Sequence, residues 1–436
     1  MSWLLGCSAA RLLGRVPACG RVATQLVVGL SAMVVAQNPN PMDSIRKLPG
    51  YRPAADTIHY LAPDRIERLV APIERPLWTA YVARSRAQYV RDTVAMQREL
   101  RAAGKSAMTR APYTHGFEVG VAMTAKWFAT DSARRMADVI LSFQAPNGGW
   151  SKHVDFSQHI RQPGESYYAE SAEWEYISTI DNASTTEEIR FLQAIDRAKP
   201  NAKYAEAIRR GLDYLLDMQM PNGCFPQVYP LQGSYHDAVT INDDAMTHAL
   251  IVLREVSDGK VTAATAAEQR RANVAVSKGL ACLLASQVVV GGKRTIWGQQ
   301  HDPLTLAPIA ARTYELTSLS ALESAGVLDF LMTLPTPNQR IVEAVYAGAE
   351  WLRDRPLHGL RYQGYVLTRD DKAPPLWGRL YEIGTNRVIM ANRDGVKQYD
   401  WNQLTDRRSG YGWYTTVPAQ TLATFEKWSR QHPLNP

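Results

Sequence analysis

The chain has 436 residues, of which 45% are hydrophobic and 21% are charged, and this composition excludes a disordered, collagen-like or coiled-coil protein. Its four cysteines are too few for a disulfide scaffold in a chain of this length. The formal net charge of +7 is too small for a nucleic-acid-binding surface, although it favours an anionic partner.

The first segment, residues 1–36, predicts a secretory signal peptide. It contains three arginines and no acidic residue, followed by an apolar run that ends at Ala36. A basic segment, an apolar segment and a small residue at the cleavage point are typical of an export signal. A membrane anchor is the alternative, but polar residues interrupt the run, which is short for a span. We therefore expect a secreted or periplasmic protein without a membrane span after cleavage.

The next segment, residues 37–110, predicts an N-terminal helical extension. Its apolar residues recur at helical spacing around Ile66–Val70 and Arg84–Leu100. We expect it to precede a catalytic domain that covers residues 111–436.

Three segments of this domain repeat one pattern. Each predicts a helix with apolar residues at three-to-four spacing, a glutamine near its end, a turn with glycine, and an aromatic residue. The helices are expected over residues 137–144, 211–219 and 279–287, before Trp150, Phe225 and Trp297. A fainter fourth copy covers Ala347–Leu352.

A second helix is expected after each turn, over residues 185–194, 243–256 and 308–322. Pro308 suits the first turn of the last of these helices. Because a unit of two helices cannot bury its apolar face alone, the copies must stack. Stacked hairpins form either a solenoid or a ring, and the unequal loops favour the ring. The sequence thus predicts a mostly α fold, an α/α toroid of repeated helical hairpins with few short strands.

Oxygen-bearing side chains follow the repeated turns, at the ends of loops that the helices would hold on one face. Asp181 and Asn182 precede the second helix of the first copy, and Asp243 opens that of the second copy. Such groups suit a hard cation such as Ca²⁺, or sugar hydroxyls. The alternative is that some of them only cap their helices.

Arginines gather in the later copies. Arg312 is expected in the helix that begins at Pro308, while Arg379 and Arg393 lie among aromatic and glycine residues near the C-terminus. The planar guanidinium group suits carboxylates. The alternative for Arg312 is a surface ion pair with Glu315 or Asp302.

Together these motifs resemble those of the family ten pectate lyases. The resemblance runs from about Gly116 to Ser409, and it departs from the family pattern at Ser151–His153 and at Cys224-Phe225. It rests on NGGW at 147–150, IDN…TTEEIRFL from 180, PNGxxPQ with YHD…NDDAM at 221–246, and WGQQHD…TLAPxxAR…YE…S at 297–318. It implies a secreted pectate lyase that cleaves α-1,4-polygalacturonate by calcium-assisted β-elimination and leaves 4,5-unsaturated oligogalacturonides.

The resemblance also implies a role for each candidate residue. Arg312 would be the base that removes the C5 proton, although arginine is nearly always protonated, so neighbouring cations would have to lower its pKa and the optimum would be alkaline. The metal ligands would be Asp181 and Asp243, which bind Ca²⁺ with the substrate. The substrate-binding residues would be Asp181, Asn182, Thr186, Arg379 and Arg393.

Two other functions remain open at this point. A toroidal glycoside hydrolase that acts on uronans would use two carboxylates, such as Asp243 and Asp302. A non-catalytic uronan-binding protein would keep the arginines without the chemistry. We also expect a monomer that contacts no nucleic acid, and the sequence leaves open whether Cys224 and Cys282 pair.

Overall fold

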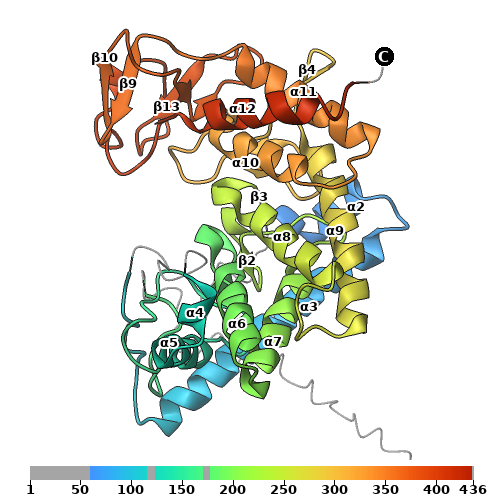
Figure 1. The fold of residues 1–436 in the computed structure, drawn as a ribbon, viewed down its shortest axis with the longest axis vertical. Coiled ribbons are helices and arrows are strands. Elements are labelled where there is room, and N and C mark those ends of the chain that lie inside the picture. Colours follow the sequence, from blue (N-terminus) through green and yellow to red (C-terminus); the bar gives the residue numbers. More distant parts are fainter. Residues whose placement is uncertain (1–58, 115–122, 170–176, 435–436) are drawn as a thin grey trace, which may run out of the picture. The chain divides into compact units, whose positions relative to one another are not determined.

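The computed structural model describes residues 59–114, 123–169 and 177–434, which lie in a compact unit of residues 41–436. The predicted signal peptide and the first part of the predicted extension lie outside these residues. The described chain is mainly helical, as predicted (Figure 1). None of its helices combines the length and the apolar character needed to cross a bilayer.

Two helices precede the repeats and confirm the helical patterning of that stretch. α2 covers Pro63–Leu69 and α3 covers Arg75–Ala102. The buried hydroxyl of Tyr81 in α3 donates a hydrogen bond of 2.9 Å to the carbonyl of Met218, at the end of a later helix. This contact fastens α3 to the repeats.

Four helical hairpins follow, and they include the fourth copy. The first helices contact one another in succession, and so do the second helices, so the hairpins form two layers. The stacked hairpins are the predicted toroid architecture. The hairpins are α5 (Asp131–Ser142) with α6 (Thr186–Ala198), α7 (Ala202–Met218) with α8 (Ala245–Ser257), α9 (Ala266–Ser286) with α10 (Ala321–Met332), and α11 (Gln339–Arg353) with α12 (Val417–Ser429); the short α4 (Ala125–Phe128) comes before them.

The repeated glutamine joins each hairpin to the next one. Its side-chain amide donates one hydrogen bond to a carbonyl of its own turn and a second to a carbonyl in the next first helix. The bonds run from Gln144 to Gly148 (2.7 Å) and Ala207 (2.9 Å), from Gln219 to Gly223 (2.9 Å) and Ala275 (2.8 Å), and from Gln287 to Thr295 and Ala344 (both 2.9 Å). The glutamine therefore satisfies two buried carbonyls at every junction.

The repeated aromatic and glycine residues have packing roles. Trp150 is fully buried, and its indole N–H donates a hydrogen bond of 2.8 Å to the carbonyl of Ile140 in α5. Gly148 has a φ of 96°, and a Cβ atom there would lie 2.3 Å from the carbonyl oxygen of Arg210. Only glycine fits so close to the neighbouring helix. The turn after α7 is also fastened covalently, since Cys224 forms a disulfide with Cys282 of α9.

Short strands join the loops of neighbouring copies at the end where the second helices begin. The pairs between copies are β1 (Ser178–Thr179) with β2 (Val228–Tyr229), β3 (Val239–Thr240) with β6 (Gln300–His301), and β8 (Leu319–Ser320) with β12 (Leu380–Tyr381). The remaining strands are β4 (Val289–Val290), β5 (Lys293–Arg294), β7 (Pro308–Ile309), β9 (Leu360–Gln363), β10 (Val366–Arg369), β11 (Trp377–Gly378), β13 (Val388–Ala391), β14 (Lys397–Gln398) and β15 (Tyr414–Thr415). All pairs are antiparallel.

The second helix of the third copy was predicted wrongly. It was expected over residues 308–322, but α10 begins at Ala321. Pro308 instead starts β7 and pairs with His301 of β6. Further along, residues 312–315 form a turn, in which the amide of Glu315 donates a hydrogen bond of 2.8 Å to the carbonyl of Arg312 and the amide of Ala311 donates one of 3.0 Å back to the carbonyl of Glu315. Arg312 therefore lies in a loop.

Candidate active site

Two tight turns carry the oxygen-rich residues of the first and second copies. The turn η4 covers Asp181–Ala183 and η6 covers Asn242–Asp244, and the two turns contact each other. Asn182 and Asp243 both have a φ of 50°. Asn and Asp tolerate this left-handed conformation better than most residues. These turns bring side chains of two copies to one place.

Asp181 is buried against a lysine. Its Oδ2 lies 2.6 Å from the Nζ of Lys152, and only 6% of the residue is exposed. Burial raises the pKa of Asp181, but the charge and hydrogen bond of Lys152 outweigh burial, so the pKa lies below its ordinary value. The carboxylate therefore stays ionised at neutral pH.

Asp243 lies over a buried arginine. The Arg379 guanidinium contacts the Oδ1 of Asp243 at 3.4 Å and the Oδ1 of Asn242 at 3.2 Å. It also forms a buried ion pair with Glu323 of α10. Burial raises the pKa of Asp243, and the charge of Arg379 offsets only part of this effect. The predicted substrate ligand Arg379 is thus a buried group beneath the second turn.

Arg312 forms the ion pair that the sequence offered as its alternative. Its Nε and a terminal nitrogen donate hydrogen bonds of 2.7 and 2.5 Å to the two carboxylate oxygens of Glu315. The Glu315 side chain is 2% exposed and that of Arg312 is 45% exposed. Burial lowers the pKa of Arg312, but Glu315 outweighs it and holds the pKa well above its ordinary value.

The pKa of Tyr235 responds to charged groups of both the Arg312 loop and the Asp181 turn. Tyr235 opens the short helix η5 (Tyr235–Asp237) of the second copy. Burial raises its pKa, the charge of Arg312 lowers it, and the charges of Glu315 and Asp181 raise it further. Charged groups of the first and third copies therefore both act on this tyrosine of the second copy.

The other predicted sugar-binding residues are placed unequally. Asn182 is exposed, and its Nδ2 lies 3.4 Å from the Nε2 of His153. Thr186 is only 1% exposed, and its hydroxyl donates a hydrogen bond of 2.7 Å to the carbonyl of Ala183, so it holds the turn. Arg393 is exposed in the loop after β13. That loop approaches the Arg312 loop, because a Cβ atom on Gly395 would lie 3.3 Å from the carbonyl oxygen of Thr313.

Asp302 lies in a different environment from Asp243. It pairs with Arg65 of α2 at 2.5 Å, and its Oδ1 accepts the amides of Leu304 and Thr305 at 2.9 and 3.0 Å. The alternative pairing of Arg312 with Asp302 is therefore wrong. These contacts give Asp302 a role in holding its own loop.

The predicted calcium ligands fit a cation in part. Asp181 Oδ1 is buried and has no hydrogen bond of normal geometry among the described residues, and the nearby Gln227 side chain helps to lower the pKa of Asp181. Asp243 supplies a partly exposed carboxylate on the adjoining turn. The described residues contain no cluster of three or more His, Cys, Asp or Glu side chains that could hold a metal. A cation held here would need oxygens from a bound ligand as well.

Sequence reasoning missed several charged residues of the site. Lys152 and Glu323 each pair with a candidate residue but were assigned no role, and Glu315 was considered only as a surface partner of Arg312. The repeat could have indicated Lys152. It lies two residues after Trp150, just as Arg379 lies two residues after Trp377. That shared position predicts a polar side chain aimed at the turns.

Comparison with known proteins gives a consistent picture. Residues 144–422 match the family model described as pectic acid lyase. The chain is similar to the solved family 10 polysaccharide lyase from Cellvibrio cellulosa, with 34% identity, 70% of this chain and 95% of that chain covered, and a TM-score of 0.63. It is also similar to an aspartate-to-alanine mutant of that lyase, solved in complex with trigalacturonic acid. The identity is 34%, the match covers 70% of this chain and 98% of that chain, and the TM-score is 0.62. No curated protein matches the chain.

Proposed function

The chain belongs to the pectic acid lyase family and is a polysaccharide lyase, and from this premise we propose that it cleaves α-1,4-polygalacturonate by calcium-assisted β-elimination. The proposal rests mainly on the contact between the turns η4 and η6, which places Asp181 and Asp243 close together. Lys152 pairs with Asp181, and Arg379 contacts Asp243. The similar lyase that holds trigalacturonic acid supports the choice of polymer.

The chemistry requires a proton to leave C5 of a uronate, next to its carboxylate. Asp181 and Asp243 would hold Ca²⁺, which when bound would neutralise that carboxylate and make the C5 proton more acidic. Arg312 accepts the C5 proton, the C4–O bond breaks as the C4–C5 double bond forms, and the leaving oxygen takes a proton from water. The products are one fragment that ends in a new reducing sugar and one that begins with a 4,5-unsaturated uronide at its new non-reducing end.

Arg312 has to lose a proton before it can accept one, and Glu315 opposes this loss because the pair stabilises the charged guanidinium. The proposal therefore requires that bound substrate and its cation weaken the Arg312–Glu315 pair. Deprotonation is then favoured only at high pH, so the optimum should be alkaline.

We further propose that the protein is exported, with residues 1–36 as the signal peptide and polygalacturonate as its extracellular or periplasmic partner. The basic and apolar layout of that segment supports export. The Cys224–Cys282 disulfide supports an oxidising compartment.

The test follows ultraviolet absorbance of polygalacturonate incubated with the purified protein, at alkaline pH, with added calcium or with a chelator. A calcium-dependent rise shows the unsaturated uronide and supports the proposal. New reducing ends without a rise would establish a hydrolase instead. Binding without either signal would establish a non-catalytic uronan-binding protein.

A further inference from the structure

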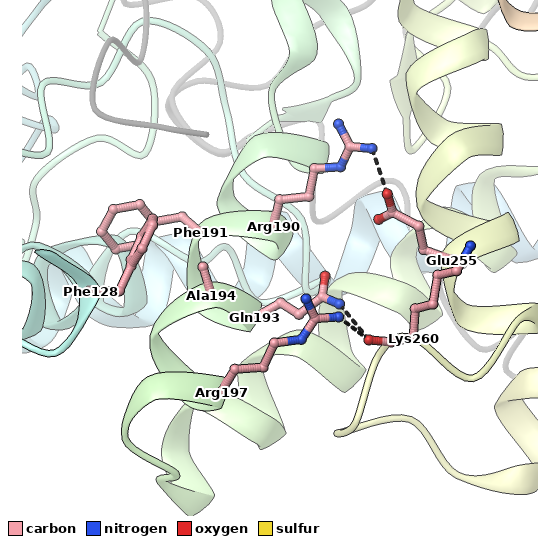
Figure 2. Close-up of a pocket in the computed structure, with 8 residues that line it drawn as sticks. All are labelled: Phe128, Arg190, Phe191, Gln193, Ala194, Arg197, Glu255 and Lys260. Carbon is pink, nitrogen blue, oxygen red and sulfur yellow. Dashed lines mark hydrogen bonds and ion pairs between the residues drawn. The ribbon is translucent and has the colours of Figure 1, made fainter. Parts of the chain in front are cut away.

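A second charged region lies on α6, away from the candidate active site. A cavity of about 500 Å³ opens between α6, the end of α8 and the end of α4 (Figure 2). Its size is that of pockets that take small organic ligands. It is lined by Phe128, Arg190, Phe191, Gln193, Ala194, Arg197, Glu255 and Lys260.

The cavity carries more positive than negative charge. Arg190, Arg197 and Lys260 are three cations, and Glu255 is the one carboxylate among the residues that line it. Lys260 also pairs at 2.8 Å with Asp258, which is not among the lining residues. Arg190 and Glu255 face each other across the cavity and pair at 2.9 Å (Figure 2). Arg190 also acts on a group outside this pair, since burial and the charge of Arg190 both lower the pKa of His248 in α8. An anion entering here would meet a favourable potential.

Its wall is held in place by buried polar contacts. Gln193, which is 5% exposed, donates a hydrogen bond of 2.9 Å from its side chain to the carbonyl of Lys260. Arg197 donates to the same carbonyl, as Figure 2 shows. The turn after α8 is thereby fixed against α6, with the Lys260 ammonium and the Arg197 guanidinium both exposed at the rim. Because the backbone of this wall is already fixed, binding a ligand costs little conformational entropy there, which favours affinity.

The cavity is separate from the candidate active site but shares its helix. Thr186 begins α6 beside the η4 turn, and Arg197 lies eleven residues further, which is about 16 Å along a helix. Arg190 and Arg197 are themselves about 10 Å apart along the axis. A polymer with a carboxylate on every sugar can offer anions to both arginines, whereas a single small anion can reach only one of them.

We propose that this cavity is an accessory binding site for the uronate carboxylates of an acidic polysaccharide, recognised by Arg190, Arg197 and Lys260. The inference rests on the proposed polygalacturonate substrate. The site binds polymer outside the reacting region and so raises the local concentration of chain near the catalytic groups.

The test measures binding of polygalacturonate to the full-length mature protein by affinity electrophoresis, with chelator present to prevent turnover. Lys260→Gln removes the exposed ammonium together with its surface ion pair to Asp258, and Arg197→Gln keeps an amide that can donate to the Lys260 carbonyl. Lys203→Gln, on the exposed side of α7, is the matched control for the loss of one charge. We expect both cavity variants to bind roughly three- to tenfold more weakly than the control.

Kinetics give the second readout. Both cavity variants should raise KM for the polymer without changing kcat, and should leave a trigalacturonate substrate unaffected. Cavity variants that bind polymer as the control does would overturn the inference. So would equal weakening toward a fully methyl-esterified polymer, because that polymer has no carboxylates.

The outcomes separate this inference from the proposed function. Wild-type protein that binds polymer through the cavity but releases no unsaturated product would disprove the lyase chemistry alone. Product formation with unaltered binding by both cavity variants would disprove the accessory site alone.

Discussion

Lys152 and Arg379 occupy the same position in two copies of one repeat, two residues after Trp150 and Trp377, and each forms an ion pair with a buried carboxylate. Lys152 holds Asp181 and Arg379 holds Glu323 while contacting Asp243. The second and third copies place Gln227 and Gln299 at this position, and the Gln299 amide donates to Asn242 and Glu323 at 3.0 Å. One repeat position thus fixes the acidic groups of the site.

Replacing Lys152 should destabilise the protein. Lys152→Met leaves Asp181 as a buried charge without its partner, which costs about 3 kcal/mol of unfolding free energy at neutral pH. The pKa of Asp181 is lowered in the folded protein, so the pair stabilises above the unfolded pKa and its contribution is lost as pH falls through the folded pKa. Urea unfolding should therefore show a deficit at neutral pH that shrinks in acid. Lys126→Met, at an exposed position of α4, is the control, and an equal deficit in the two variants would contradict this account.

Arg312→Ala should reduce kcat by about a thousandfold, because the variant has no group to accept the C5 proton. Affinity for polygalacturonate, measured by electrophoresis, should change far less. The thermal unfolding midpoint should fall, because the variant leaves the buried Glu315 carboxylate without its ion-pair partner, so turnover is measured well below that midpoint. The exposed Arg430, at the end of α12, provides the control substitution. Near-normal turnover in Arg312→Ala would rule out Arg312 as the base.

Glu315→Gln tests whether Arg312 is the base by changing the partner that controls the pKa of Arg312. Glu315 raises the pKa of Arg312, so its neutral isostere should lower that pKa and move the alkaline rise of kcat to lower pH by roughly one unit or more. The pH profile is the readout, since a purely structural defect would lower kcat at every pH without moving the profile. Glu206→Gln, which alters a surface pair with Arg209, should leave the profile in place. An unmoved profile in Glu315→Gln would mean that the alkaline rise does not report on Arg312.

Asp243→Asn should raise the calcium concentration needed for half-maximal activity roughly tenfold, because it removes one charged oxygen ligand. The pKa of Asp243 is raised, so the wild type should lose calcium activation in mild acid sooner than an ordinary aspartate site would. Calcium titrations at two pH values check both statements, with Asp213→Asn on the surface as the control. Identical titrations for Asp243→Asn and wild type would remove Asp243 from the metal site.

The disulfide should contribute substantially to stability. Cys224 and Cys282 are 58 residues apart, and closing a loop of that length is worth about 4 kcal/mol in the chain-entropy account. Reductant should lower the urea midpoint of the wild type but not that of the double alanine variant. If reductant shifts neither protein, the two thiols do not pair in solution.

The hairpins were predictable because their cause is local. Apolar residues at three-to-four spacing, a glutamine and a glycine turn predict α5, α7 and α9, and the start of α8 was placed to within two residues. Pro308 misled because a proline suits both the first turn of a helix and the beginning of a strand. Pro308 pairs with His301, only seven residues earlier, but this strand pair extends from β3 of the preceding copy, a contact that the local pattern could not reveal.

Sequence reasoning named one partner, Glu315 for Arg312, but missed the other partners of the candidate residues. Sequence reasoning singled out Asp243 and Arg379, yet the contact between them spans 136 positions. The Arg379–Glu323 pair spans 56 positions, and a helical glutamate gives no local sign of it. The sequence also did not show burial: the resemblance implies substrate-binding roles for Arg379 and Thr186, and the structure buries each against the turn that it contacts.

The stacking of hairpins has a consequence for how activity is lost. The charged groups come from every copy: Asp181 from the first, Asp243 from the second, Arg312 from the third and Arg379 from the fourth. Detachment of any single hairpin would scatter them while most of the helices survive. Turnover should therefore vanish at lower denaturant than circular dichroism does, which makes catalysis a sensitive reporter of the first junction to open.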